Sequence, residues 1–329
     1  MQIYFNKDCD ISLIQSKKLG FIGYGSQGRA HALNLKDSGV QQIKISLYEG
    51  SKTSIQVVKD GFKLENIETL CSWADIIVFA LPDEIQAEIY EQFVKSNIRD
   101  GAALCFIHGL NIHFNLIKPK ASLDVFMVAP KGPGYAVRDE YVSGRGTICL
   151  IAVAQNESKT AKDIALSYSM ALGCGNAGIF ETSFRDECVG DLFGEQVVLC
   201  GGLTELIRNG YEILVENGID PHIAYLECVH EVKLVVDLIY KKGIASMNKS
   251  ISNTAEWGEY VAGPKVIDDV VKNNMQQIFL NINNGNFVEN WIKEYKTGMK
   301  NIKKIRNDND KKPIEKVGAK IRSILPWLS

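Results

Sequence analysis

Gly23-Tyr24-Gly25-Ser26-Gln27-Gly28 has the G-x-G-x-x-G spacing of a dinucleotide-binding turn. It follows a short apolar run, residues 18–22, and precedes a helical pattern that ends near Gly39. In such a motif the first glycine permits a tight turn, the second lets a pyrophosphate approach the backbone, and the third lets helix pack on strand. The amides at the helix N-terminus then face the anion. This stretch therefore predicts a Rossmann-type, dinucleotide-binding domain.

The residues that follow continue the alternation of strand and helix. His108 and Lys131 each come directly after an apolar run, and Asp83 follows another. Ligands bind beyond the carboxyl ends of the strands in an open α/β sheet, so each of the three is a candidate site residue. A turn histidine or a solvated surface lysine would also explain two of them singly. The predicted strands are residues 43–48, 75–81, 102–107, 125–129 and 147–153.

The segment after the second predicted strand bears on the choice of nicotinamide cofactor. An NAD enzyme usually has an acid at this strand end to hold the ribose hydroxyls, whereas Tyr48 stands there in this chain, before Glu49. Ser51, Lys52 and Thr53 could hold a 2′-phosphate, or they could form a polar turn that caps the next helix. Two hydroxyls and a lysine favour NADP.

After Thr182 the strand pattern stops and helical periodicity takes over. We therefore predict an α/β Rossmann-type domain over residues 1–182 and an all-α domain over residues 183–329, which suits a chain of 329 residues. Breaks are predicted at Asn209-Gly210 and Asn217-Gly218. The predicted helices are residues 186–208, 220–242 and 265–283.

Two pairs of carboxylates stand at helical spacing in the second half. Asp191 and Glu195 are four residues apart, as are Glu227 and Glu231, and residues at i and i+4 share one face of a helix. Apolar residues continue both faces, so both pairs are expected to point toward packed interior. A buried, unpaired carboxylate costs roughly several kcal/mol. Lys or Arg partners in structural salt bridges could supply the charge, but four carboxylates also suit two Mg²⁺ ions that share one acid, and this is the leading hypothesis.

Composition excludes several other classes of protein. The net charge of −2 gives no electrostatic footprint for nucleic acid or a membrane surface. No apolar run reaches the ~20 residues that cross a bilayer, and the first ten residues lack a signal-peptide core. The eight cysteines have no C-x-x-C or zinc-like spacing and are typical of core residues in a reducing cytosol. We expect a cytoplasmic protein.

One polar loop, residues 249–256, concentrates hydroxyl groups. Asn253 with Glu256 three residues later resembles a helix cap. The alternative is a hydroxyl cluster that binds a small polar ligand.

Taken in order, several segments resemble short-form bacterial ketol-acid reductoisomerases along nearly the whole chain. They are IGYGSQG, LPDEIQAEIY, FIHGLNIHF, PKGPG, DLFGEQVVLCGG, ECVHEVKLVVDLI, SISNTAEWG and PIEKVGAKIRSILPWL. The resemblance implies an NADP-dependent, Mg²⁺-dependent oxidoreductase of valine and isoleucine biosynthesis that converts 2-acetolactate or 2-aceto-2-hydroxybutyrate to a 2,3-dihydroxy acid. It also implies a knotted helical domain that pairs with a second subunit, in a homodimer at least.

The resemblance also assigns roles by position. Asp191 would bridge two Mg²⁺ ions with Glu195 beside it, while Glu227 and Glu231 would bind the second metal from the neighbouring subunit. Ser252 would contact the substrate from that subunit. His108, Lys131 and Glu195 are the predicted catalytic residues. The predicted cofactor contacts are Gly23, Tyr24, Gly25, Ser26, Gln27, Ser51, Thr53, Asp83, Glu84, Ile85, Gln86 and Gly134.

The chain departs from the family pattern at the cofactor segment. Many members have Arg where this chain has Tyr48, and Ser where it has Thr53. Loss of the Arg removes a bidentate partner for a phosphate, which weakens the expected preference for NADPH. Arg29 and Tyr135 each replace a frequent His, without a functional consequence that the sequence reveals.

Two other classes fit part of the sequence. A metal-independent NADP hydroxyacid dehydrogenase would share the two-domain pattern but would leave the four acids without a role. A nicotinamide-sensing regulator would bind the cofactor without turnover. Activity on a 2-hydroxy acid that survives EDTA would favour the first, and the absence of Mg²⁺-dependent NADPH oxidation would favour the second.

Overall fold

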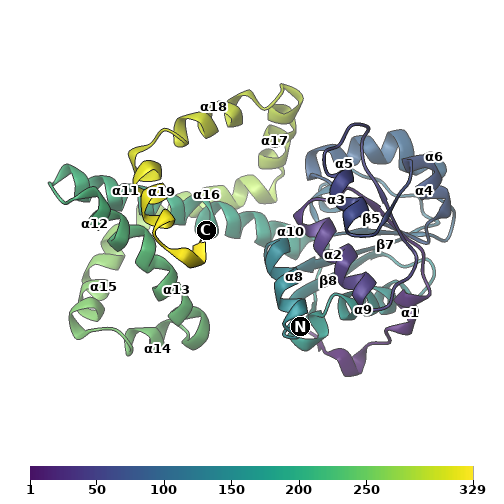
Figure 1. The fold of residues 1–329 in the computed structure, drawn as a ribbon, viewed down its shortest axis with the longest axis horizontal. Helices are drawn as coiled ribbons and strands as arrows, with labels where there is room; N and C mark the ends of the chain where they lie inside the picture. Colours follow the sequence, from purple (N-terminus) through teal and green to yellow (C-terminus); the bar gives the residue numbers. More distant parts are fainter. Residues whose placement is uncertain (329) are drawn as a thin grey trace. The chain divides into compact units, whose positions relative to one another are not determined.

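The computed structural model describes residues 1–328, and the chain forms two compact units, Met1–Gly190 and Asp191 onward (Figure 1). Ser329, the last residue of the predicted second domain, lies outside the described residues. None of the helices in residues 1–328 combines the length and apolarity needed to cross a bilayer.

The first unit is built on a nine-stranded, mostly parallel sheet. Its order is β1-β9-β8-β7-β6-β5-β2-β3-β4, with β1 antiparallel to β9 and β7 antiparallel to β8. Strand order reverses at β2, which pairs with β3 on one side and β5 on the other. The strands are β1 Ile3–Tyr4, β2 Leu19–Ile22, β3 Ile43–Ser46, β4 Lys63–Leu64, β5 Ile76–Phe79, β6 Ala103–Phe106, β7 Asp124–Pro130, β8 Cys149–Gln155 and β9 Ile179–Glu181.

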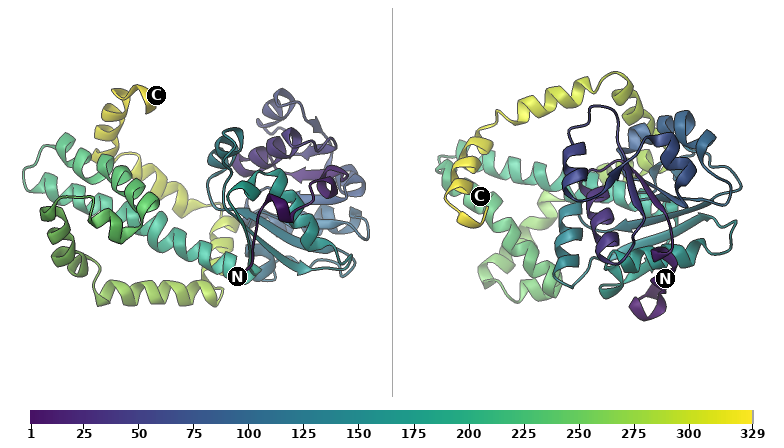
Figure 2. Two further views of the ribbon diagram at one scale, coloured as in Figure 1. Left: turned by 90° about the horizontal axis from the view of Figure 1, so that it is seen from below. Right: turned by 45° about the vertical axis from the view of Figure 1, so that its right-hand side comes forward.

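Helices cover both faces of this sheet, so the strands are apolar on both sides (Figures 1 and 2). Leu35, Val57 and Tyr168, from α2, α3 and α9, pack on one face. Leu70 and Tyr90 pack on the other. The predicted Rossmann-type class is confirmed. The helices are α1 Ser12–Gln15, α2 Ser26–Asp37, α3 Ser54–Lys59, α4 Ile67–Trp73, α5 Asp83–Ile89, α6 Lys95–Asn97, α7 Leu110–His113, α8 Gly134–Val142, α9 Ala161–Ala171 and α10 Phe184–Phe193, with shorter helical turns at Asn6–Asp8, Tyr90–Val94 and Cys174–Asn176.

In the described residues from Asp191 on, every regular element is helical, as predicted. Near the chain end, Ile314 and Ile321 of α19 join Tyr211 and Tyr225 in a small apolar cluster. The knotted topology stays a prediction. The elements are η4 Gly194–Leu199, α11 Gly201–Glu216, α12 Pro221–Tyr225, η5 Leu226–His230, α13 Glu231–Lys242, α14 Ile244–Asn248, α15 Asn253–Val266, α16 Asp269–Asn283, α17 Asn286–Lys296, α18 Lys300–Asn309, α19 Pro313–Ser323 and η6 Pro326–Leu328.

One predicted helix break is wrong and the other is confirmed. α11 runs through Asn209-Gly210, where a Cβ on Gly210 would lie 3.4 Å from Sγ of Cys228. The Asn209-Gly210 pair therefore lies inside the helix and does not end it. Asn217 does end α11, and Gly218 has φ +87°. The helix predicted to start at residue 265 starts at Asp269, because the Asp268 side chain accepts from Val271 N and caps it there.

His31 of α2 is fully buried in the first unit, and its burial predicts an acid-sensitive fold. Its Nδ1 lies 3.1 Å from the Tyr168 hydroxyl, and Nε2 has no hydrogen-bond partner. Burial lowers the pKa of His31 from 6.5 to about 3. As pH falls from 6.5 toward 3, the His31 ring takes up a proton in the unfolded chain but not in the folded chain. The free energy of unfolding therefore decreases over this pH range.

The expected slope from this one group approaches about 1.4 kcal/mol per pH unit. Denaturant unfolding at a series of pH values between 6.5 and 4 measures it. His31→Leu should show a correspondingly flatter dependence, whatever its absolute stability. Equal slopes for wild type and variant would contradict the assignment.

Candidate active site

The glycine fingerprint forms the turn between β2 and α2. Gly23 has φ +98°, and a Cβ there would lie 2.5 Å from the carbonyl oxygen of Ala80. A Cβ on Gly28 would lie 2.8 Å from that of Ala80, so this glycine permits helix and strand to pack. A Cβ on Gly25 would meet nothing within 4 Å. The turn thus leaves open space at Gly25, the glycine that a pyrophosphate is expected to approach. The turn therefore fits a dinucleotide.

The other residues of the turn connect it to neighbouring loops. Tyr24 is buried, and its hydroxyl donates to Oδ2 of Asp60 at 2.9 Å. Gln27 Nε2 donates to the carbonyl of Gly132, while its buried Oε1 has no partner. A Cβ on Gly134 would lie 2.4 Å from the backbone of Ser26, which brings the start of α8 directly onto the start of α2.

The predicted cofactor-selecting segment lies between β3 and α3. Tyr48 and Glu49 are exposed, whereas Ser51 is buried. Ser54 donates through its hydroxyl to the carbonyl of Ser51 at 2.7 Å. Thr53 is the N-cap residue of α3, but its side chain makes no capping hydrogen bond. The Thr53 hydroxyl therefore does not cap α3, which was the alternative role predicted for it.

The predicted contacts Asp83, Glu84, Ile85 and Gln86 form the first turn of α5, after β5. Gln86 is buried and donates to the carbonyl of Leu81 and to Asp83 Oδ1, while its Oε1 accepts from Asn111. Its side chain orders the turn. The predicted cofactor contacts thus follow β2, β3, β5 and β7 at their carboxyl ends, the edge where the fold binds ligands.

His108 and Lys131 meet at one carboxylate, Glu187 of α10. His108 Nδ1 lies 3.1 Å from Glu187 Oε2, and the Gly109 amide donates to the same oxygen at 2.9 Å. Lys131 Nζ lies 3.4 Å from Oε1. The Glu187 side chain is only 2 % exposed, whereas the Lys131 side chain that reaches it is 36 % exposed. The expected neighbourhood of His108 and Lys131 is present, with Glu187 joining them.

Sequence reasoning missed Glu187, although a signal for it exists. Glu187, Asp191 and Glu195 follow one another at intervals of four residues, so Glu187 precedes the predicted pair by one helical turn. An acid in the first turn of a helix is also explained by the helix dipole, so this spacing alone is a weak signal.

The charges within this cluster reinforce one another. Burial lowers the pKa of His108, but contacts with Cys188 and Glu187 outweigh burial and hold this pKa well above 6.5. Burial raises the pKa of Glu187, yet His108, Lys131 and the Gly109 amide bring it below its ordinary value. The cluster is therefore an ion pair in which a protonated His108 donates to an ionised Glu187.

Asp191 extends this cluster by one turn of α10. Glu187 and Asp191 stand four residues apart on α10, so the two carboxylates share one face of that helix. A protonated His108 does not bind metal, which leaves the carboxylates as the candidate ligands. Carboxylate oxygens are the ligands that Mg²⁺ prefers, so the donor set fits the predicted ion.

Both predicted acid pairs lie at π-helical segments, which sequence spacing did not reveal. Glu195 lies in η4, where Cys200 N donates to Glu195 O at 2.9 Å. Glu227 lies in η5, and Glu231 N closes it by donating to Leu226 O. Single π-turns inside helices are frequent at functional sites because they shift side chains relative to an α-helix. In residues 1–328, Glu227 and Glu231 join no ligand cluster.

The expectation that the acid faces point into packed interior is wrong for the single chain. Glu195, Glu227 and Glu231 are exposed. Val198 and Leu199, the apolar residues that continue the first face, are also exposed, at 56 % and 64 %. Helical periodicity identifies an apolar face, but it does not say which surface covers it.

Ser252, the predicted substrate residue, is the N-cap of α15. Its hydroxyl accepts from the Ala255 amide at 3.2 Å, and the residue is exposed. The cap predicted at Asn253 therefore lies one residue earlier.

Fold and site together define a class: an oxidoreductase with an NAD(P)H-binding Rossmann-type unit followed by a helical unit. Family models match both parts, "Acetohydroxy acid isomeroreductase, NADPH-binding domain" over residues 13–178 and "Ketol-acid reductoisomerase, C-terminal domain" over residues 184–327. The chain belongs to the ketol-acid reductoisomerase family, and membership implies a place in branched-chain amino acid biosynthesis.

Solved structures agree with this assignment. An NADH-preferring ketol-acid reductoisomerase from an uncultured archean is similar with a TM-score of 0.96 and 42 % identity, over 99 % of this chain and 100 % of that one. A semialdehyde dehydrogenase NAD-binding protein from Cupriavidus necator shares the fold alone, with a TM-score of 0.61 and 17 % identity over 81 % of this chain and 98 % of that one.

Proposed function

We propose that the chain isomerises and reduces 2-acetolactate or 2-aceto-2-hydroxybutyrate to the 2,3-dihydroxy acid, in the synthesis of valine and isoleucine. The observation that carries the proposal is the cluster of His108 and Lys131 around the buried Glu187, with Asp191 one turn beyond Glu187 on α10. It stands at the carboxyl ends of β6 and β7 in a Rossmann-type unit, where a substrate can meet a nicotinamide.

The reaction moves a methyl or ethyl group between neighbouring carbons and then reduces a ketone. When bound, two Mg²⁺ ions would hold the two substrate oxygens and lower the pKa of the tertiary hydroxyl, and the nicotinamide would supply hydride. Protonated His108, fixed by Glu187, donates toward an oxygen that gains negative charge. Lys131 adds positive charge on the same side, and Glu195 takes up the hydroxyl proton.

Asp191 and Glu195 would hold metal from one copy of the chain, while Glu227 and Glu231 would reach the site of a second copy. Exposed apolar side chains on the helical unit support a homodimer at least. They include Val198, Leu199, Leu206, Leu234, Val236 and Trp257. An area of this kind on a protein surface usually marks an interface.

For the cofactor we propose NADPH, with weak discrimination against NADH. Ser51 and Thr53 would hold the 2′-phosphate through their hydroxyls, and Lys52, which is exposed, would approach it. Tyr48, which is 78 % exposed, offers no charge, and the neighbouring Glu49 opposes a phosphate. The similar archaeal enzyme is described as NADH-preferring, which is consistent with a modest preference.

Tyr48→Arg is expected to raise the preference for NADPH over NADH about tenfold, because a guanidinium can hold the 2′-phosphate through two hydrogen bonds. The ratio of kcat/KM for the two cofactors measures the effect. Ile55→Arg is the matched control, since it adds the same charge to α3 at an equally exposed residue. Equal ratios for Tyr48→Arg and the control would contradict the proposed location of the phosphate.

A coupled assay tests the proposed activity. Acetolactate, NADPH and Mg²⁺ should together give NADPH oxidation, and EDTA should abolish it. Oxidation that needs no metal would favour the hydroxyacid dehydrogenase. Cofactor binding without turnover under any of these conditions would favour the regulator.

A further inference from the structure

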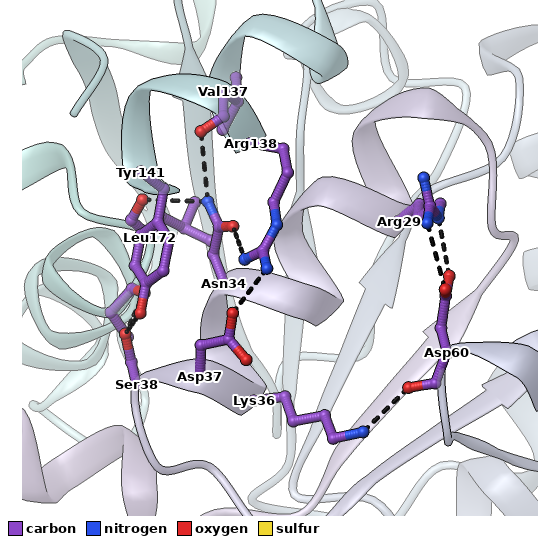
Figure 3. A network of polar contacts seen from close by, with 11 residues as sticks. Arg29, Asn34, Lys36, Asp37, Ser38, Asp60, Val137, Arg138, Tyr141 and Leu172 are labelled. Atoms are coloured by element: carbon purple, nitrogen blue, oxygen red, sulfur yellow. Dashed lines mark hydrogen bonds and ion pairs between the residues drawn. The ribbon is translucent and has the colours of Figure 1, made fainter. Parts of the chain in front are cut away.

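Asp60, the residue after α3, accepts hydrogen bonds from several side chains around the cofactor turn. Arg29 of α2 donates to both of its carboxylate oxygens, from Nε at 2.7 Å and from Nη2 at 3.1 Å (Figure 3). Tyr24 donates to Oδ2, and Gln56 donates to Oδ1 at 2.8 Å. Lys36 Nζ donates to the backbone carbonyl of Asp60 at 2.9 Å. The Asp60 side chain is only 9 % exposed and makes four charged or polar contacts.

The Asp60 carboxylate is firmly ionised. Hydrogen bonds from Arg29 are the largest cause, and they bring the pKa of Asp60 to about 2. A bidentate guanidinium–carboxylate pair is directional as well as strong. It therefore fixes the position of Asp60 relative to α2, and not merely its charge.

The other end of α3 carries the predicted cofactor-selecting residues. Asp60 N donates to Gln56 O, and Val57 N donates to Thr53 O, so the helix is hydrogen-bonded along its length. Ser54 is bonded to Ser51 through both backbone and hydroxyl, and Ser51 N donates to Tyr48 O. A continuous set of hydrogen bonds thus joins Asp60 to the segment from Tyr48 to Thr53.

Tyr24 connects the same carboxylate to the glycine turn. Its hydroxyl reaches Asp60, and its ring packs edge-on against Phe62 with centroids 5.9 Å apart. Arg29 lies just after the third glycine of the fingerprint, on the first turns of α2. One carboxylate is therefore bonded to the pyrophosphate turn, to α2 and to the end of α3.

We propose that Asp60 is a positioning residue for the adenosine half of the cofactor: with Arg29 and Tyr24 it fixes the spacing between the pyrophosphate turn and the segment that holds the ribose. This inference rests on the proposed function, because it assumes that the nicotinamide cofactor binds at the fingerprint. Asp60 acts on both cofactors alike, since it sets a spacing and does not read the 2′-phosphate.

Asp60→Asn tests the proposal, because an amide cannot serve both donors of Arg29 as an ionised carboxylate does. Titration of the purified protein with NADPH and with NADH, followed by nicotinamide fluorescence, should give affinities about five- to tenfold weaker for both, the size of a coupled side-chain pair. The KM for each cofactor should rise by the same factor, while kcat and the KM for acetolactate stay within about twofold.

Asp37→Asn is the matched control. Asp37 also lies on α2 and accepts from an arginine, Arg138, at 2.6 Å, but this pair ties α2 to α8 on the side away from Asp60 (Figure 3). A purely structural role of Asp60 would lower thermal stability but leave cofactor affinity unchanged, as in Asp37→Asn; because the Asp60 side chain is 9 % exposed and that of Asp37 is 45 % exposed, cofactor affinity and not stability is the readout compared. Arg29→Gln should reproduce the loss seen in Asp60→Asn, and the double variant should lose no more than either single one.

The experiment distinguishes failure of the proposed function from failure of the positioning role of Asp60. If wild type binds neither nicotinamide cofactor, the proposed function is wrong. If wild type binds and Asp60→Asn binds equally well, or if Asp37→Asn loses as much affinity, the positioning role is wrong while the proposed function stands. A loss confined to NADPH would also overturn it, because Asp60 would then act through the 2′-phosphate.

Discussion

Asp191→Asn should lower turnover of acetolactate by about a thousandfold, because a carboxylate that neutralises bound metal is worth several kcal/mol in the transition state. Asp191 follows Glu187 by one turn of α10, and its substitution removes one of the two carboxylates on that face of the helix. Turnover at saturating Mg²⁺ measures the loss, and calorimetric titration with Mg²⁺ gives a readout that does not depend on turnover.

Asp186→Asn is the control for Asp191→Asn. Asp186 is a carboxylate of the same helix, 64 % exposed and paired with Arg185. Its substitution should leave turnover and Mg²⁺ affinity within about twofold, as expected for a surface ion pair. Normal Mg²⁺ affinity in Asp191→Asn would contradict the assignment of this residue as a metal ligand.

Glu187→Gln should lower kcat by a factor of about 100 or more. It leaves His108, Lys131 and the Gly109 amide without the anion that all three share, and a buried charge that loses its partner costs roughly 3–5 kcal/mol. Because Glu187 helps raise the pKa of His108, the variant should also lose activity at a lower pH on the alkaline side of the profile.

The matched control for this variant is Glu181→Gln. Glu181 accepts from Lys162 and Tyr4, each at 2.8 Å, in the same unit and outside the cluster. It should keep wild-type kcat and an unchanged pH profile. An alkaline limb that does not move in Glu187→Gln would show that His108 is not held protonated by this carboxylate.

The sequence predicted those parts of the fold in which local sequence signals and tertiary packing favour the same structure. Gly23, Gly25 and Gly28 could be assigned separate roles because each role depends on the absence of a Cβ, and the structure places Gly25 in open space and the other two against Ala80. The alternation of apolar strands and helices likewise predicted the parallel sheet. The helical second half was also predicted correctly, although the helix break at Asn209-Gly210 was not.

The site was only partly accessible to the same reasoning. His108 and Lys131 were found because strand ends share one edge of a sheet. The contacts of Glu187 were missed because His108 and Lys131 lie 79 and 56 positions away along the chain. The four-residue spacing to Asp191 places Glu187 on a helix face but does not predict these two contacts. The π-turns at Glu195 and Glu227 were missed because a spacing of four residues is read as an α-helix.

The sequence by itself determined the class of fold, the cofactor turn and the family, because these depend on short-range rules for glycine, on apolar periodicity and on segment order. Only the tertiary structure decided which charges meet. Glu187 joins His108 and Lys131, and Asp60 joins Arg29 and Tyr24, because sheet and helix packing bring distant residues within hydrogen-bond distance. Electrostatic interactions depend on separation and burial in space, and neither quantity is written in the order of residues.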